Sequence, residues 1–467
     1  MKTTIQTIAP RVWCTEIDLG GEVPGTLPTP ADQAPYESAR VLIRLHGESL
    51  MFVERPVVDG SFALGDVVTG LATAARSRLD VHLAEDGGSV EIVDGVAYVH
   101  APWQCSRTRP AGPSMTVVVC TRGRGEALRS CLAQLARMDY PGLDFVIVDN
   151  APVDDSTRTA FLGEVGEDAR FRYVVEPRPG LSCARNRGLA EARGELIAYT
   201  DDDVSVDPQW ADSLITGFLR REDVACVTSL VCTASLETPA EYYFDARVSW
   251  ATRCEPRVYD SVAPDGDLLY PYSAGLFGTG AGMAFRTAVI RELGGFDEAL
   301  GAGTRTAGGE DLDAFVKVLQ DGHAIAYEPS SVVWHHHRAD LKGLQKQMYA
   351  YGTGLTAFLT KHLLDRDTRG DLLRRIPKGI AKLALIPRTT KDSVEQAPAQ
   401  SEISSRMLLL REFTGMAMGP FLYGVARRRI PTELPPVAAV TPVSTTMIPA
   451  QRQSSVEDRA TTTSSMN

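Results

Sequence analysis

The chain contains four apolar segments of strand length: TVVVC at residues 116–120, FVIVD at 145–149, FRYVV at 171–175 and LIAYT at 196–200. Helical patterns lie between them, at 126–137, 157–162 and 183–192. Apolar strands that alternate with helices predict parallel pairing, with both faces of the sheet covered. We therefore expect an α/β fold here, with a mostly parallel central sheet.

Polar residues follow these strands at their carboxyl ends. Thr121 and Arg122 come directly after the first strand, Asp149 ends the second, and the run 201–203 follows the fourth. Ligands of open α/β sheets bind outside the carboxyl ends of the strands. The sequence therefore predicts a ligand site at this edge of the sheet.

Three consecutive carboxylates, Asp201, Asp202 and Asp203, form the strongest local feature. Neighbouring negative charges repel one another, and a divalent cation with oxygen ligands, Mg²⁺ or Mn²⁺, would hold them together. The alternative is a solvated acidic turn or a helix N-cap, since aspartate favours both. The preceding apolar strand and the following Trp210 favour the metal site.

A second acidic motif, GGEDLD at residues 308–313, opens an apolar-periodic helix. Its glycines allow the backbone to approach a ligand closely, and Glu310 and Asp311 lie at the helix N-terminus. Such a carboxylate could accept a proton from an attacking hydroxyl group. Helix capping is the alternative for one of these acids.

Three histidines, His335, His336 and His337, follow the apolar segment VVW at 332–334. Neutral imidazole is a common metal ligand. Side chains alternate along an extended chain, so His335 and His337 should share one face.

Basic residues accompany these motifs. The loop TRGR at 121–124 suits a diphosphate, although it lacks the spacing of a Rossmann glycine motif or a P-loop. Arg185, in the segment ARNRG at 184–188, could bind the same group or be an exposed helix charge.

Together these motifs resemble those of the inverting family 2 glycosyltransferases, which have the GT-A fold, a Rossmann-like nucleotide-diphospho-sugar transferase fold. The resemblance covers about residues 116–359 and looks closest to non-processive bacterial members, since no Gln-x-x-Arg-Trp motif follows the Glu-Asp pair. The segments that carry it are VVVCTRGR (117–124), VDN (148–150), GLSCARNRG (180–188), YTDDD (199–203), GTGAGMAF (278–285), GGFDEALG (294–301), GGEDLD (308–313) and VWHHHR (333–338).

The resemblance implies roles for matching positions. It implies catalysis by Asp311 as general base, beside Glu310. Nucleotide contacts are implied for Thr121, Arg122, Asp149, Arg185, Asp201 and Asp202. A site for Mn²⁺ or Mg²⁺ is implied at Asp201, Asp203 and His335, with His336 and His337 left open as alternatives to His335.

The implied function is metal-dependent, inverting transfer of a sugar from a nucleotide-diphosphate sugar to an acceptor hydroxyl, as in cell-envelope or polysaccharide biosynthesis. Two alternatives stay open: a sugar nucleotidyltransferase, and a nucleotide-sugar-binding module without catalysis. The sugar, the base of the donor and the acceptor are not determined by these residues.

Changes in composition along the sequence divide the chain into four parts. Residues 1–112 are expected to form a small N-terminal α/β accessory domain, with strands at 40–46 and 49–53, a helix at 68–84 and a hairpin at 88–100. Residues 113–360 form the predicted GT-A domain, and 361–429 a helical, partly basic extension. Residues 430–467 hold few large apolar side chains, which predicts a disordered tail.

Charge and targeting features restrict the partners and the location. The 467-residue chain has a net charge of −11, which argues against nucleic-acid binding. The start of the chain has no apolar signal region, and no uncharged apolar run reaches the length of a membrane span. We expect a cytoplasmic protein; the basic segment 361–391 and the apolar run 407–426 either contact the inner membrane face or pack as a helical pair.

The eight cysteines form no Cys-x-x-Cys pair, and several lie within apolar runs. Reduced, buried thiols are therefore favoured over disulfides or a zinc site.

Overall fold

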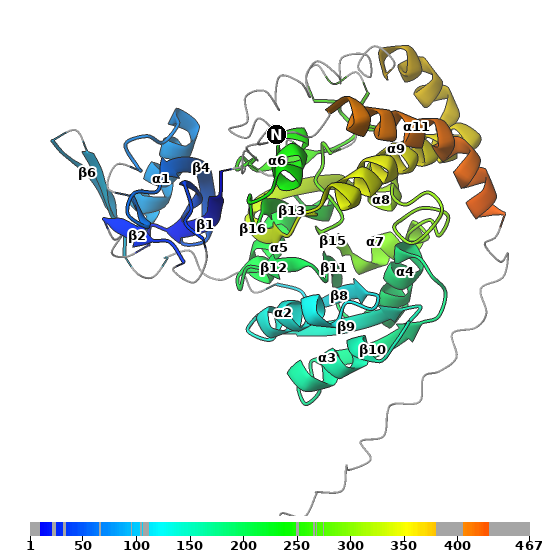
Figure 1. Cartoon of the computed structure of the whole chain (residues 1–467), viewed down its shortest axis with the longest axis horizontal. Helices are drawn as coiled ribbons and strands as arrows, with labels where there is room; N and C mark the ends of the chain where they lie inside the picture. The colour runs from blue at the N-terminus through cyan, green and yellow to red at the C-terminus, as the bar shows by residue number, and fades with distance from the viewer. Residues whose placement is uncertain are drawn as a thin grey trace, which may run out of the picture. The chain divides into compact units, whose positions relative to one another are not determined.

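The computed structural model describes residues 10–20, 25–30, 34–64, 67–94, 96–102, 105, 112–248, 252–264, 267, 269–273, 275–379 and 405–428 (Figure 1). The tail predicted at 430–467 and the basic residues 380–391 lie outside the described residues. The chain divides into two units, Met1–Ile430 and Pro431–Asn467, and every described residue belongs to the first.

A nine-stranded sheet forms the centre of this unit, in the order β10-β9-β8-β11-β15-β13-β16-β12, with β14 paired to β16. Six strands (β10, β9, β8, β11, β13 and β16) point the same way, whereas β15, β12 and β14 are antiparallel. The predicted α/β fold with a mostly parallel central sheet is confirmed. The strands are β8 (Met115–Thr121), β9 (Leu143–Asn150), β10 (Phe171–Glu176), β11 (Leu196–Asp201), β12 (Val204–Val206), β13 (Val224–Thr233), β14 (Arg257–Tyr259), β15 (Gly282–Arg286) and β16 (Ala324–His335).

Helices cover both faces of this sheet, which is why its strands are apolar throughout. Side chains alternate between the faces, so that Val117 and Val119 join one core cluster while Val118 joins the other. The first cluster includes side chains of α2 (Gly125–Leu135), α3 (Ser156–Glu164) and α5 (Trp210–Leu219). The second includes side chains of α4 (Leu181–Glu191), α7 (Thr287–Glu292) and α8 (Glu310–Gln320).

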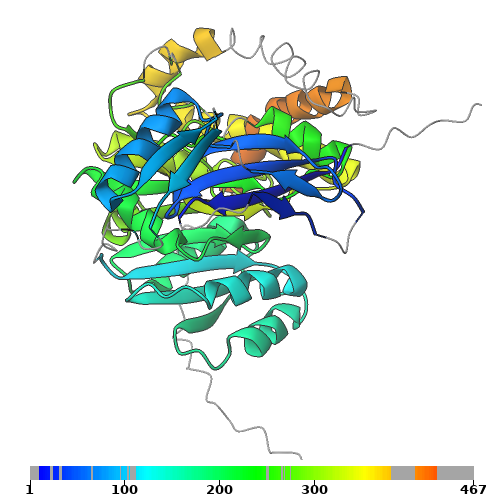
Figure 2. The same ribbon diagram turned by 90° about the vertical axis from the view of Figure 1, so that its left-hand side faces the viewer.

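The N-terminal region has its own sheet, β1-β3-β4, on which helix α1 packs, as the blue elements of Figure 2 show. The two strands predicted here and the hairpin are present. The helix begins at Thr73 rather than at 68, because Gly70 and the extended Ala72 interrupt the helical conformation before it. The elements are β1 (Val12–Asp18), β2 (Thr26–Pro28), β3 (Ser38–Leu45), β4 (Glu48–Pro56), β5 (Ser61–Ala63), α1 (Thr73–Asp86), β6 (Ser89–Val93) and β7 (Val96–His100).

A buried ion pair between Arg44 and Asp207 joins this region to the central sheet region. The Arg44 side chain, 4% exposed, binds the carboxylates of Asp207 and Glu16. A backbone hydrogen bond of 2.9 Å runs from Val12 N to Leu236 O. Removing one partner of such a buried pair is strongly destabilising, so this contact contributes to the stability of the junction.

Two long helices, α9 (Leu341–Leu364) and α11 (Ser405–Arg427), pack together, and residues 369–379 are also helical. Their backbones touch at glycines: a Cβ atom on Gly352 would lie 2.0 Å from Glu412 O, and one on Gly415 would lie 2.2 Å from Tyr349 O. This contact accounts for the apolar run at 407–426. The helical extension predicted at 361–429 is confirmed within its described residues, 361–379 and 405–428. Among the described helices, which also include α6 (Pro239–Arg247), none has both the length and the apolarity needed to cross a membrane.

Candidate active site

The three aspartates lie where β11 ends and turns into β12, and an arginine bridges two of them. Asp202 accepts hydrogen bonds of 2.6 Å from Thr121 Oγ1 and from Arg124 Nη1. Arg124 Nη2 donates to Asp203 at 2.9 Å. Arg124 thus neutralises part of the repulsion between the carboxylates. It was not among the predicted site residues, although the motif TRGR contains it.

The histidines come next to Asp203 because β12 pairs with the end of β16, with Val204 opposite His335. His335 Nε2 lies 3.7 Å from Asp203 Oδ1. Its Nδ1 lies 3.1 Å from Nδ1 of His337, so these two rings do share a face, while His336 is exposed. Burial lowers the pKa of His335, and burial beside His335 lowers the pKa of His337 to about 3. Both rings are therefore neutral near pH 7, the form that binds metals.

A metal ion could be held at this point. One ligand atom each from Asp201, Asp203 and His335 lies within 4.8 Å of the others. Desolvation raises the pKa of Asp201 to about 7, and the neighbouring Asp203 adds to the rise, while Arg185 opposes it. Carboxylate oxygens and a neutral imidazole are donors that suit Mn²⁺ or Mg²⁺, so the residues fit such an ion.

The acidic pair at the start of α8 divides into a buried and an accessible carboxylate. Glu310 is 6% exposed and accepts a 2.9 Å hydrogen bond from Arg185 Nη1. Asp311 is partly exposed, and its Oδ2 accepts a 3.0 Å hydrogen bond from Gly280 N. Arg185 Nη2 in turn donates to Gly280 O at 3.1 Å. Asp311 is therefore the acid that a substrate can reach, and Glu310 is bound to a buried cation.

Backbone packing sets the start of α8. Gly309 has a φ of 90°, in the left-handed region that favours glycine. A Cβ atom there would lie 2.5 Å from Gly354 O in α9. Farther along α8, the buried Asp313 binds Lys361 Nζ of α9 at 2.6 Å. Helix α9 thus holds the element that carries Asp311.

Asp149 lies beside the aspartates because the strands are in register: Thr121 is opposite Asp149, and Cys120 is opposite Asp201. Asp149 is 1% exposed, and its Oδ2 accepts a 2.6 Å hydrogen bond from Tyr173 Oη. Desolvation raises the pKa of Asp149, although the Tyr173 hydroxyl opposes this. Tyr173 belongs to β10 and was not predicted, since only strand pairing brings it here.

Arg122 is exposed, and its Nε donates to Ala151 O at 3.2 Å. It therefore lies at the rim of the same strand edge, apart from the hydrogen bonds that connect Arg124 with the aspartates. Of the predicted residues, Thr121 donates directly to Asp202, and Arg124 joins Asp202 to Asp203. Arg185 links Glu310 to Gly280.

Comparison with known proteins finds a family match over part of the chain. The family model described as Glycosyl transferase family 2 matches residues 116–262. By this match, residues 116–262 form a family 2 glycosyltransferase domain. The matched segment contains Asp149, Arg185 and the three aspartates, whereas Asp311 and His335 lie beyond it.

The relatives of this chain are distant in sequence. The pre-mycofactocin glycosyltransferase of Mycobacterium tuberculosis is 27% identical over 320 residues, which are 66% of this chain and 62% of the relative. An uncharacterized protein, y4gI, of Sinorhizobium fredii is 28% identical over 284 residues, or 57% of this chain and 29% of the relative. The chain therefore matches less than two thirds of the length of either.

Among solved structures, a mannosyltransferase from Pyrobaculum calidifontis in complex with GDP-Man and Mn²⁺ is similar, with a TM-score of 0.43 and 20% identity. The match covers 70% of this chain and 90% of that one.

Proposed function

We propose that this chain is a metal-dependent, inverting and non-processive glycosyltransferase that moves a sugar from a nucleotide-diphosphate sugar to an acceptor hydroxyl group. The observation that supports this most is the position of Arg185. Its Nη2 atom lies 3.8 Å from Asp201 Oδ1 and its Nη1 atom 2.9 Å from Glu310 Oε1. A single buried guanidinium therefore connects the acids of the metal site with the helix that carries Asp311.

Each group then has a separate task. Asp149, braced by Tyr173, contacts the nucleoside, and Thr121 and Arg124 line the diphosphate. Mn²⁺ or Mg²⁺ bound by Asp201, Asp203 and His335 would stabilise the negative charge of the departing diphosphate.

Asp311 supplies the base. Its carboxylate accepts the proton of the acceptor hydroxyl while that oxygen attacks the anomeric carbon from the face opposite the leaving group, which inverts the anomeric centre. Gly280 N holds the carboxylate in place, and Glu310 is unavailable as the base because Arg185 binds it.

Donor binding is tested by thermal unfolding of the full chain with a panel of nucleoside diphosphates and nucleotide sugars, each with and without Mn²⁺. A ligand at about 100 times its dissociation constant adds about 2.7 kcal/mol of stability, which is a visible shift. We expect a Mn²⁺-dependent shift of the unfolding midpoint for the nucleotides of one nucleobase. If no donor shifts the midpoint, the proposed nucleotide site is wrong; a shift without turnover on any acceptor would favour a binding module.

The metal site is tested by Asp203→Ala. This change removes one proposed ligand and also a hydrogen-bond partner of Arg124. We expect the enhancement of nucleotide binding by Mn²⁺ to fall at least about tenfold, since the loss of even an outer-shell partner lowers metal affinity by that factor. Isothermal titration of the nucleotide at several Mn²⁺ concentrations measures the effect. Asp223→Ala, which breaks a surface ion pair with Arg221, is the matched control. Unchanged titrations in Asp203→Ala would exclude this role.

A further inference from the structure

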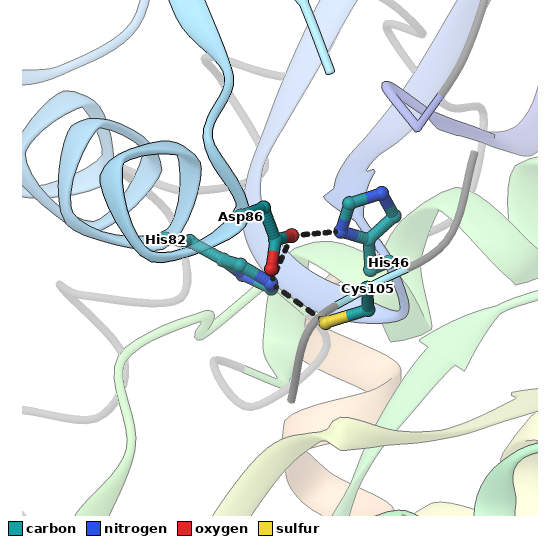
Figure 3. A group of neighbouring side chains, drawn as sticks. All are labelled: His46, His82, Asp86 and Cys105. Atoms are coloured by element: carbon teal, nitrogen blue, oxygen red, sulfur yellow. Dashed lines mark hydrogen bonds and ion pairs between the residues drawn. The ribbon is translucent and has the colours of Figure 1, made fainter. Parts of the chain in front are cut away.

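A second group of potential metal ligands lies in the N-terminal region, outside the glycosyltransferase domain. Its members are His46, His82, Asp86 and Cys105, and one donor atom from each lies within 4.8 Å of the others (Figure 3). The sequence alone does not reveal this group, because its residues are far apart along the chain and form no recognised motif. Only His82 and Asp86, four residues apart on α1, had helical metal-ligand spacing.

Three separate elements bring the group together. His46 lies in the turn between β3 and β4, the pair on α1 comes next, and Cys105 follows β7. His46 has a φ of 48°, a conformation that non-glycine residues rarely adopt. The Asp18 carboxylate stabilises this turn by accepting hydrogen bonds from His46 N at 2.8 Å and Gly47 N at 2.7 Å. The turn therefore holds its imidazole in one direction.

Each imidazole is also oriented from its outer side. His46 Nε2 lies 2.8 Å from the carbonyl oxygen of Pro102, and His82 Nδ1 lies 2.9 Å from Glu48 Oε2. Because both of these oxygens are acceptors, the outer nitrogens carry the protons. The inner nitrogens, Nδ1 of His46 and Nε2 of His82, then direct their lone pairs toward Asp86 and Cys105. Metal-binding histidines show this arrangement, in which the second nitrogen donates to a carbonyl or carboxylate.

The distances inside the group suit a small tetrahedral ion. Bonds of about 2.0–2.3 Å from a tetrahedral zinc ion place its ligands about 3.3–3.6 Å apart. His82 Nε2 lies 3.2 Å from Cys105 Sγ and 3.4 Å from Asp86 Oδ2. His46 Nδ1 lies 2.7 Å from Asp86 Oδ2, and this separation would lengthen by about 0.6 Å around the ion.

The burial of these side chains also favours a bound metal ion. The side chains of His46, His82 and Asp86 are 6%, 2% and 0% exposed. Buried charged groups are paired or coordinate metals. A proton shared between His46 and Asp86 would satisfy that pair alone, and it would leave unexplained why His82 Nε2 and a thiol converge on the same point.

We propose that His46, His82, Asp86 and Cys105 bind one Zn²⁺ ion as a structural site. Four protein ligands complete a tetrahedral shell and leave no position for water or substrate, which distinguishes structural from catalytic zinc sites. A thiolate and two imidazoles prefer zinc to Mg²⁺ or Mn²⁺, whereas the aspartates at 201–203 prefer the latter. The ion ties the chain after β7 to the sheet and to α1. This proposal does not depend on the proposed catalytic function.

The test is the zinc content of the full chain, purified without an affinity tag and measured by inductively coupled plasma mass spectrometry. Asp203→Asn serves as the background, so that zinc bound at the active-site acids does not contribute. We expect about one zinc per chain. Cys105→Ser and His82→Ala should each lose most of it, while His100→Ala, which alters an exposed histidine of the same region, should retain it.

Cobalt substitution gives an independent reading. The Co²⁺ form of the Asp203→Asn chain should show the visible d–d bands of tetrahedral cobalt and a thiolate charge-transfer band in the near ultraviolet. Cys105→Ser should abolish the charge-transfer band while the chain remains folded by circular dichroism. Absence of zinc together with absence of this band in the parent would overturn the proposal. Zinc that persists in both Cys105→Ser and His82→Ala would also overturn it, because the ion would then be bound elsewhere.

Discussion

Replacing Asp311 with asparagine should lower kcat by about 10²–10⁴-fold, the usual contribution of a positioned general base. Asparagine has nearly the same shape and retains an oxygen that can accept the hydrogen bond from Gly280 N. It has no carboxylate to take the proton of the acceptor hydroxyl. The structure therefore predicts a loss of turnover without a loss of the donor site.

Steady-state kinetics and the nucleotide-induced thermal shift distinguish these effects. In Asp311→Asn we expect the donor-induced shift to remain while turnover falls. Asp321→Asn provides the matched control, since Asp321 lies at the other end of the same helix and its side chain is 48% exposed. Near-normal turnover in Asp311→Asn would mean that another group is the base. Loss of the thermal shift would mean that Asp311 maintains the donor site.

Arg44→Met should destabilise the chain by about 3–5 kcal/mol, the cost of breaking a buried ion pair by removing one partner. Arg44 binds Asp207, whose side chain is 5% exposed, and also donates to Gly47 O at 2.9 Å. Methionine fills much of the same volume but leaves the Asp207 carboxylate buried without its cation. The loss therefore arises mainly from the unpaired negative charge.

Urea unfolding measures this effect, and the double variant Arg44→Met with Asp207→Leu tests the cause. Removing both charges should recover much of the stability, because a buried pair can often be replaced by apolar groups at small cost. Arg76→Ala breaks an exposed pair with Asp80 and should change stability by less than about 1 kcal/mol. If Arg44→Met behaves like Arg76→Ala, this ion pair does not hold the N-terminal region in place.

The central sheet could be predicted from sequence because strands that are buried on both faces must be apolar along their whole length. Strand β1 was missed, since VWCTEID mixes polar and apolar residues and pairs in parallel with β3, with no hairpin turn between them. Parallel partners that are distant along the chain leave little local pattern. The start of α1 was predicted too early, because the helical spacing of apolar residues continues through the turn that precedes the helix.

The acidic motifs of the site could also be found from the local sequence. The different environments of neighbouring residues could not be predicted in this way. Glu310 and Asp311 are equivalent in sequence, and only the tertiary contact of Arg185 with Glu310 separates them. Likewise, the turn after β8 determines that Arg124 rather than Arg122 reaches the aspartates. Arg124 and Tyr173 thus required the structure.

The glycine contacts between α11, α9 and the start of α8 have a consequence for how this protein can vary. Because Gly415, Gly352, Gly354 and Gly309 let main chain lie directly against main chain, the position of Asp311 depends on backbone spacing and little on the side chains that face outward. The outer surfaces of these helices are therefore free to diverge and acquire other partners. A single added methyl group at one of these contacts would instead push the helices apart and displace the Asp311 carboxylate.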